Sequence, residues 1–261
     1  MTQELLYQAA DGIATITLNR PEKLNAFTKD MVGRWADALA DAQRDQSVHA
    51  IIVTGAGRAF CSGGDLDVLG KAEPTGLDHK GFIWEGVHRI PLTLEAIDKP
   101  VIAMVNGVAT GAGLDMALMC DLRFASDQAR FAETYVKAGV VPGDGGAYFL
   151  PRLVGLDRAL EMLWTGDFVD AEEALRMGLV TRVVPHDQLQ KVTYEFARRI
   201  VEGPPVAIRM TKRAVYQCLR TDLRTALDLI SSHIALTMQT EDHREGVKAL
   251  KERRAPRFRG Q

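Results

Sequence analysis

Residues 106–115, with the sequence NGVATGAGLD, decide the fold. They follow the apolar run 100–105 (PVIAMV) and precede residues with helical spacing, so we expect a buried strand, a turn of small residues and a helix. Residues 60–66 (FCSGGDL) form a second stretch of the same kind. Glycine lets a ligand approach the backbone closely, and the first N–H groups of a helix have no partner within it. Two such turns can donate to one oxygen, as in an oxyanion hole, or can serve only to pack helices on strands.

The rest of the chain alternates between strand and helix patterns. Alternating or apolar β-branched runs at 13–18, 50–54, 122–125 and 129–132 predict short strands, and Thr28 can cap a helix that follows it. One helix is expected from about Phe82 to Ile97. After residues 203–205 (GPP) only helical patterns remain, over 206–219, 223–239 and 242–254. We therefore predict an α/β core over residues 1–200 and a helical C-terminal region over residues 201–261.

The composition is that of a globular protein. Of 261 residues, 46% are hydrophobic and 25% are charged, which excludes disordered and collagen-like chains. Lys and Arg number 32 against 34 Asp and Glu, so no whole-surface attraction for nucleic acid or membrane is expected. No apolar run approaches the roughly 20 residues that span a bilayer. Three separated cysteines indicate neither a disulfide framework nor a metal site, and we expect a cytoplasmic protein.

Other glycine-containing stretches do not match the known ligand-binding or catalytic motifs. Residues 55–57 (GAG) follow a strand, but Phe60 stands where a dinucleotide-binding fingerprint has its third glycine. Residues 64–71 are one residue too long for a phosphate-binding loop, and Ala72 replaces its Ser or Thr. Residues 62–64 (SGG) do not form a nucleophile elbow. We read the first two, residues 55–57 and 64–71, as tight turns.

Five motifs occur in order along the chain: residues 19–26 (NRPEKLNA), 62–66 (SGGDL), 106–121, 142–146 (PGDGG) and 171–180 (AEEALRMGLV). Together they resemble the enoyl-CoA hydratase/isomerase (crotonase) family over nearly the whole chain. The resemblance implies a spiral of ββα units with a C-terminal helical trimerisation region, forming a homotrimer or a dimer of trimers. It implies an acyl-CoA thioester as substrate, with coenzyme A as part of the substrate and no separate cofactor.

The resemblance also implies roles for individual residues. The oxyanion hole would be formed by the backbone N–H groups of Gly64 and Ala112. The remaining matched positions would contact the substrate or its CoA part: Lys23, Ser62, Gly63, Asp65, Leu66, Gly111 and Tyr135.

The acidic residues differ from those of family hydratases, which carry two glutamates. Asp115 stands at the first glutamate position, three residues after Ala112 and therefore on the same helix face. Tyr135 stands at the second glutamate position, where it cannot act as a carboxylate. The second catalytic acid would therefore be either Glu133 or Asp144. Glu133 lies two residues before Tyr135, and on a strand the two side chains would share a face. Asp144 lies between glycines in a loop expected at the pocket.

This pattern favours an enoyl-CoA hydratase that adds water to a 2-enoyl-CoA thioester. Hydration needs one group that activates water and another that protonates the α-carbon, whereas double-bond migration can proceed with one carboxylate. An enoyl- or dienoyl-CoA isomerase is therefore the alternative within the class. Because Tyr135 replaces a carboxylate, a non-catalytic CoA-ester-binding or assembly protein is the alternative of another class.

Overall fold

A six-stranded sheet runs through the molecule. The computed structural model describes residues 3–65 and 75–261. A hairpin of β1 (Leu5–Ala10) and β2 (Ile13–Leu18) forms one edge of the sheet and is its antiparallel pair. The sheet continues in parallel with β3 (Ala50–Gly55), β5 (Val101–Val105), β7 (Leu122–Ser126) and β10 (Arg182–Val184).

A second, smaller sheet has four strands. It contains, in order, β4 (Ala59–Cys61), β6 (Val108–Thr110), β8 (Arg130–Ala132) and β9 (Val169–Asp170). Strands β3, β5 and β7 each enter the large sheet, are followed by β4, β6 or β8 in the small sheet, and then lead to helical segments. The expected α/β fold, a spiral of ββα units, is confirmed.

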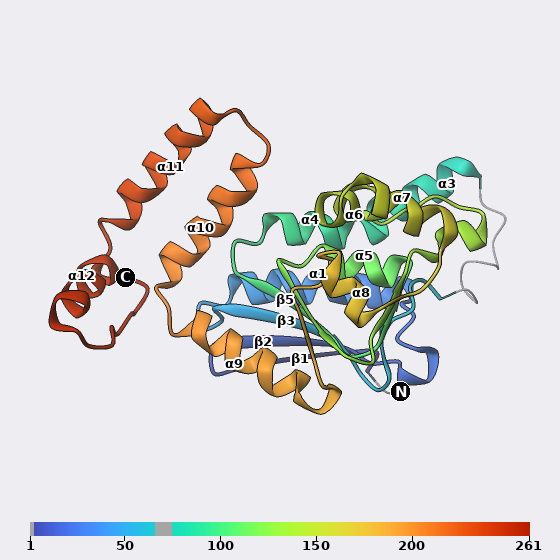
Figure 1. The fold of residues 1–261 in the computed structure, drawn as a ribbon, viewed down its shortest axis with the longest axis horizontal. Coiled ribbons are helices and arrows are strands. Elements are labelled where there is room, and N and C mark those ends of the chain that lie inside the picture. Colours follow the sequence, from blue (N-terminus) through green and yellow to red (C-terminus); the bar gives the residue numbers. More distant parts are fainter. Residues whose placement is uncertain (1–2, 66–74) are drawn as a thin grey trace.

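Helices cover both faces of the large sheet (Figure 1). The α-helices are α1 (Lys29–Arg44), α3 (Gly76–Gly81), α4 (Arg89–Ala96), α5 (Ala112–Leu118), α6 (Gly146–Val154), α7 (Leu156–Thr165), α8 (Ala171–Arg176), α9 (Leu189–Val201), α10 (Pro205–Cys218), α11 (Leu223–Thr237) and α12 (Glu241–Glu252). Shorter helical turns are η1 (Pro21–Lys23), η2 (Phe82–Val87), η3 (Thr134–Ala138) and η4 (His186–Gln188), of which η2 is a π-helical turn. Among the described helices, none is both long enough and apolar enough to cross a lipid bilayer.

Two hydrophobic cores hold the sheet in place. Thr28 caps α1 by accepting a hydrogen bond from the Met31 backbone, and the helix then buries Trp35 and Leu39 in the larger core. On the opposite face, α9 packs Leu189 and other side chains against the smaller core. The sheet is therefore rigid, and the ends of its strands can position side chains accurately.

The last three helices form an arm that projects from the body of the molecule, shown in orange and red in Figure 1. Helix α10 buries none of its side chains fully. Two ion pairs join it to the body, Asp98–Arg209 and Asp121–Lys212, and a third, Glu95–Arg220, is made by the turn that follows the helix. The other two helices of the arm, α11 and α12, begin and end close to their predicted positions. The division of the chain into two regions at about residue 200 stays a prediction.

Candidate active site

The two glycine turns predicted from the sequence lie against each other. Gly63 has a φ of +98°, and a Cβ atom at this position would lie 3.3 Å from the Thr110 carbonyl oxygen and 3.5 Å from the Ala112 nitrogen. The Thr110 hydroxyl also donates a hydrogen bond to the Ser62 carbonyl at 3.3 Å. The end of β4 and the start of α5 are thereby brought into direct contact.

Glycine is required at two positions of the second turn. Gly111 precedes α5 with a φ of +50°, in the region that favours glycine. A Cβ atom at Gly113 would overlap the carbonyl oxygen of Cys61 in β4. Helix α5 can therefore begin directly beside β4 only because these side chains are absent.

The backbone N–H groups of Gly64 and Ala112 are available as donors. Phe27 donates to the Gly63 carbonyl and accepts from the Asp65 N–H, so the Gly64 N–H points away from Phe27. Ala112 is the first residue of α5, where an N–H has no acceptor within the helix. Within residues 3–65 and 75–261, neither N–H has a hydrogen-bond acceptor. In the described part of the chain, both N–H groups are therefore without an acceptor of the protein's own.

Three carboxyl groups and one phenol gather next to this turn. Asp115 is completely buried on α5, and its Oδ2 accepts a hydrogen bond from the Tyr135 hydroxyl at 2.7 Å. The same hydroxyl lies 2.9 Å from Oδ2 of Asp144. Glu133 is completely buried beside them, and both Glu133 Oε1 and Asp115 Oδ1 approach Gly146 at the start of α6. Because a phenol has one proton, Tyr135 can donate to only one aspartate at a time.

Burial controls the ionisation of this cluster. It raises the pKa of Asp115 to about 6, and the nearby Asp144 charge acts in the same direction, while the hydrogen bond from Tyr135 opposes the rise. Burial, together with the negative charge of Asp115, raises the pKa of Glu133 to about 10. Burial also raises the pKa of Asp144 and, more strongly, that of Tyr135. At neutral pH, Asp115 is therefore mostly ionised, while Glu133 and Tyr135 keep their protons.

The position of Glu133 differs from the expectation. Strand β8 ends at Ala132, and Glu133 precedes the 3-10 turn η3 that contains Tyr135. The expectation that the two side chains share a strand face was therefore wrong. In the described part of the chain, neither carboxyl oxygen of Glu133 has a hydrogen-bond partner, and the same holds for Oδ1 of Asp115 and of Asp144.

The residues expected at the CoA part lie around the first turn. Lys23 ends η1 with an exposed side chain, and its carbonyl accepts a hydrogen bond from the Ser62 hydroxyl at 3.4 Å. Asp65 is 7% exposed and pairs with Arg20 at 2.9 Å, so its carboxylate braces the turn. Leu66 lies outside the described residues.

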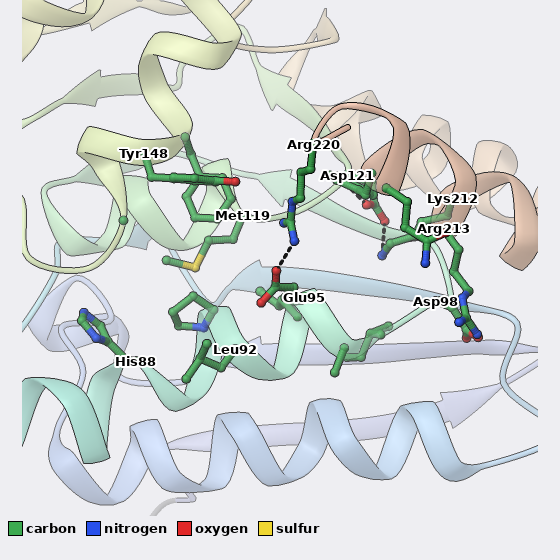
Figure 2. A pocket seen from close by; sticks show the side chains of 18 of the residues that line it. His88, Leu92, Glu95, Asp98, Met119, Asp121, Tyr148, Lys212, Arg213 and Arg220 are labelled. Carbon is green, nitrogen blue, oxygen red and sulfur yellow. Dashed lines mark hydrogen bonds and ion pairs between the residues drawn. The ribbon is translucent and has the colours of Figure 1, made fainter. Parts of the chain in front are cut away.

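A cavity of about 940 Å³ lies between α4 and α10, and Asp144 is the member of the acid cluster that lines it. His88, Leu92, Met119 and Tyr148 lie together at one end of it (Figure 2). The far end carries charged side chains, including the paired Lys212 and Asp121 that Figure 2 joins by a dashed line. Its size matches that of small-molecule sites in proteins.

Comparison with known proteins identifies the family. A family model described as enoyl-CoA hydratase/isomerase matches residues 8–261. The chain belongs to the enoyl-CoA hydratase/isomerase family. It is 36% identical to the 1,2-epoxyphenylacetyl-CoA isomerase of Escherichia coli over 100% of both chains, and 34% identical to the crotonyl-CoA hydratase of Syntrophomonas wolfei over 98% of both. A solved enoyl-CoA hydratase from Mycobacterium smegmatis superposes with a TM-score of 0.93 at 34% identity, covering 98% of this chain and 99% of the other.

Within this hydratase/isomerase family member, two features of the site were missed from the sequence. Tyr135 was expected only as a substrate contact, although it stands where a family carboxylate would be, and its hydroxyl lies between Asp115 and Asp144. His88, whose ring is hydrogen-bonded to the Gly143 carbonyl, had no predicted role. Both depend on contacts between distant segments, for which sequence spacing holds no signal.

Proposed function

We propose that this family member is an enoyl-CoA hydratase in which Asp115 and Asp144 divide the acid and base work. The observation that carries the proposal is the pair of hydrogen-bond distances, 2.7 and 2.9 Å, that places one phenolic hydroxyl between two buried carboxyl groups. Two carboxyl groups joined in this way can hold different protonation states at the same time, which hydration requires. No cofactor is needed beyond the CoA that the substrate carries.

Water adds to the double bond with two proton transfers. Ionised Asp115 removes a proton from water as the water oxygen bonds to the β-carbon, and the electrons of the double bond move to the thioester oxygen. The N–H groups of Gly64 and Ala112 stabilise the resulting enolate, a contribution of about 3–4 kcal/mol for one donor in comparable sites. Protonated Asp144 then delivers a proton to the α-carbon. The proton gained by Asp115 passes through the Tyr135 hydroxyl to Asp144, which restores the starting state.

The same hydroxyl also supports a second candidate reaction. In an isomerase, one carboxylate removes a proton from the acyl chain and the proton returns at a different carbon. The path through Tyr135 would let a proton taken by Asp115 be returned by Asp144. The isomerase is therefore the alternative activity.

Turnover of defined substrates separates these reactions. The purified protein would be given crotonyl-CoA, a 3-enoyl-CoA and a 3,5-dienoyl-CoA in ¹⁸O-labelled water, and the products would be analysed by mass spectrometry. Incorporation of ¹⁸O into the product of crotonyl-CoA supports the hydratase, whereas a shifted double bond without ¹⁸O supports the isomerase. Binding of all three without turnover would instead indicate a non-catalytic CoA-ester-binding protein.

The Asp115→Asn variant tests the central assignment. It should lower kcat by about a thousandfold or more while acyl-CoA binding changes little, because the backbone donors remain. Asp30→Asn makes the same chemical change at an exposed aspartate of α1 that pairs with Arg34, and it serves as the control. Unchanged turnover of Asp115→Asn would remove Asp115 from the mechanism.

The cavity points to an acyl group larger than crotonyl. Trp84, Leu92 and Tyr148 line it and are 59%, 50% and 42% exposed, so an apolar acyl chain would cover them. We expect trans-2-octenoyl-CoA to have a higher kcat/KM than crotonyl-CoA. Leu92→Trp should reverse this preference by narrowing the cavity, and equal loss for both substrates would contradict the assignment.

The arm supports assembly into a homotrimer or a dimer of trimers. Leu223 and Leu250 are 75% and 81% exposed on its helices, and Leu219 in the turn after α10 is 78% exposed, which is typical of an interface. Light scattering coupled to size-exclusion chromatography should give three or six times the chain mass. Leu250→Asp should lower the mass, and a monomeric wild-type protein would contradict the proposal.

A further inference from the structure

The segment that carries Asp144 has few attachments to the rest of the protein. It connects η3 with α6 and contains residues 141–144 (VPGD), which form no helix or strand. In the part of the chain that the structure describes, these four residues take part in two hydrogen bonds. One joins the Asp144 carboxyl to Tyr135, and the other joins the Gly143 carbonyl to the ring of His88.

The bond from His88 is short and has a defined direction. Nε2 of His88 lies 2.7 Å from the Gly143 oxygen. A carbonyl oxygen can only accept, so Nε2 carries the proton and donates it. Trp84 contacts the same ring edge-on, with the two centroids 5.6 Å apart and the planes at 77°. The imidazole is therefore held in one orientation, directed at the backbone next to Asp144.

The local fold directs His88 to this position. The residues before it form the π-helical turn η2 (Phe82–Val87), and the His88 N–H reaches back five residues to the Ile83 carbonyl at 2.9 Å. A π turn inserts one residue into a helix and rotates the residues that follow, and such turns occur often at functional sites. After it, α4 starts with a new register in which His88 faces the cavity and Arg89 faces Asp37 on α1.

We propose that His88 is a positioning residue that holds Asp144 in place for its acid role. The proposal rests on the proposed function, in which Asp144 protonates the α-carbon. The hydrogen bond fixes the backbone of Gly143, one residue before Asp144, in a segment whose glycines permit many backbone conformations. Without it, the Asp144 carboxyl would depend on the Tyr135 hydroxyl alone and would often lie out of line with the substrate.

A double-mutant cycle tests this role with trans-2-octenoyl-CoA as the substrate. His88→Leu removes the donor and should lower kcat about tenfold with KM within about twofold, while His88→Gln, which can donate from a similar point, should restore most of it. In the Asp144→Asn background, His88→Leu should lower kcat less than twofold further. The asparagine that replaces Asp144 cannot donate a proton as an acid, so its position no longer affects the rate. Arg89→Ala, at the next residue and facing α1, is the matched control and should leave kcat unchanged.

Two outcomes would overturn the proposal. Unchanged kcat in His88→Leu would show that Asp144 needs no support from His88. A tenfold loss that persists in the Asp144→Asn background would show that His88 acts on something other than Asp144. The proposed function fails separately: if Asp144→Asn alone keeps full turnover, Asp144 is not the acid, and His88 then cannot act by positioning it.

Discussion

Removal of the Tyr135 hydroxyl should change the pH dependence of the reaction. Tyr135→Phe keeps the ring but deletes the donor that lies 2.7 Å from Asp115. A hydrogen bond to a charged group contributes about 1.5–3 kcal/mol, and about 2 kcal/mol corresponds to a pKa change of about 1.5. The donor favours the ionised form of Asp115, so its loss raises the pKa from about 6 to roughly 7.5.

The expected loss of activity therefore depends on pH. At pH 7 the ionised fraction of Asp115 would fall from about 0.9 to about 0.25, which is a fourfold loss in kcat/KM from ionisation alone. At pH 9 the carboxylate would be almost fully ionised in both proteins, and this part of the loss would disappear. The assay is the pH profile of kcat/KM with trans-2-octenoyl-CoA between pH 5 and 9.

The control removes an equivalent hydroxyl elsewhere. Tyr194→Phe deletes a hydroxyl that lies 2.7 Å from the Thr15 hydroxyl, in the packing of α9 on the sheet. This variant should leave the acid limb of the profile in place. If the limb of Tyr135→Phe also stays near pH 6, or if its activity falls equally at every pH, then Tyr135 does not control the ionisation of Asp115 and the reasoning from the hydrogen bond is refuted.

Three further predictions concern the cluster and the thiols. Burial raises the pKa of Glu133 above its unfolded value, so the wild-type protein takes up a proton when it folds and loses stability as the pH rises. Glu133→Gln lacks this loss, so in urea titrations its free energy of unfolding relative to wild type should rise by up to about 1.4 kcal/mol per pH unit between pH 5.5 and 8.5. A fall in this difference would show that Glu133 is ionised. Gly146→Ala would place a methyl group against Asp115 Oδ1 and displace the carboxyl group, so kcat should drop about tenfold or more. The circular dichroism spectrum should stay unchanged. Full activity would mean that the Asp115 carboxyl group moves freely. Burial raises the pKa of Cys61 and of Cys120 to about 12, so Ellman's reagent should react with one thiol in the native protein and three after denaturation; rapid reaction of all three would contradict this burial.

Much of the fold follows from local patterns. The strands at residues 13–18 and 50–54 and the three C-terminal helices appear close to their predicted positions, because their apolar periodicity determines them. The prediction omitted β1, although Asp11 and Gly12 between β1 and β2 form a two-residue turn with φ values of +51° and +79°. Such a turn is a strong hairpin signal. The single helix expected from Phe82 instead starts with a π turn, which periodicity does not reveal.

The site was predictable only in part. The two glycine turns could be related because each follows a strand, whereas the roles of Gly64, Ala112 and Asp115 came from the resemblance to the family. The contact of Tyr135 with Asp144 joins two segments through a loop without regular structure, so no period links them. Long-range hydrogen bonds of this kind depend on how the elements pack, which the sequence pattern does not encode locally.

The ion pairs of α10 and of the turn after it have a consequence for the cavity that this helix helps to enclose. Both side chains of the Arg220–Glu95 pair are 50% exposed, and those of Arg209 and Asp98 are 35% and 15% exposed. Dissolved ions weaken exposed pairs, and about 1 M salt shortens the range of charge interactions to about 3 Å. The body of the molecule is held instead by buried apolar side chains, which salt does not weaken in this way. Ionic strength should therefore loosen the exposed contacts at the wall of the cavity while pH changes the charge of the buried acids, so the two variables should act on different parts of the molecule.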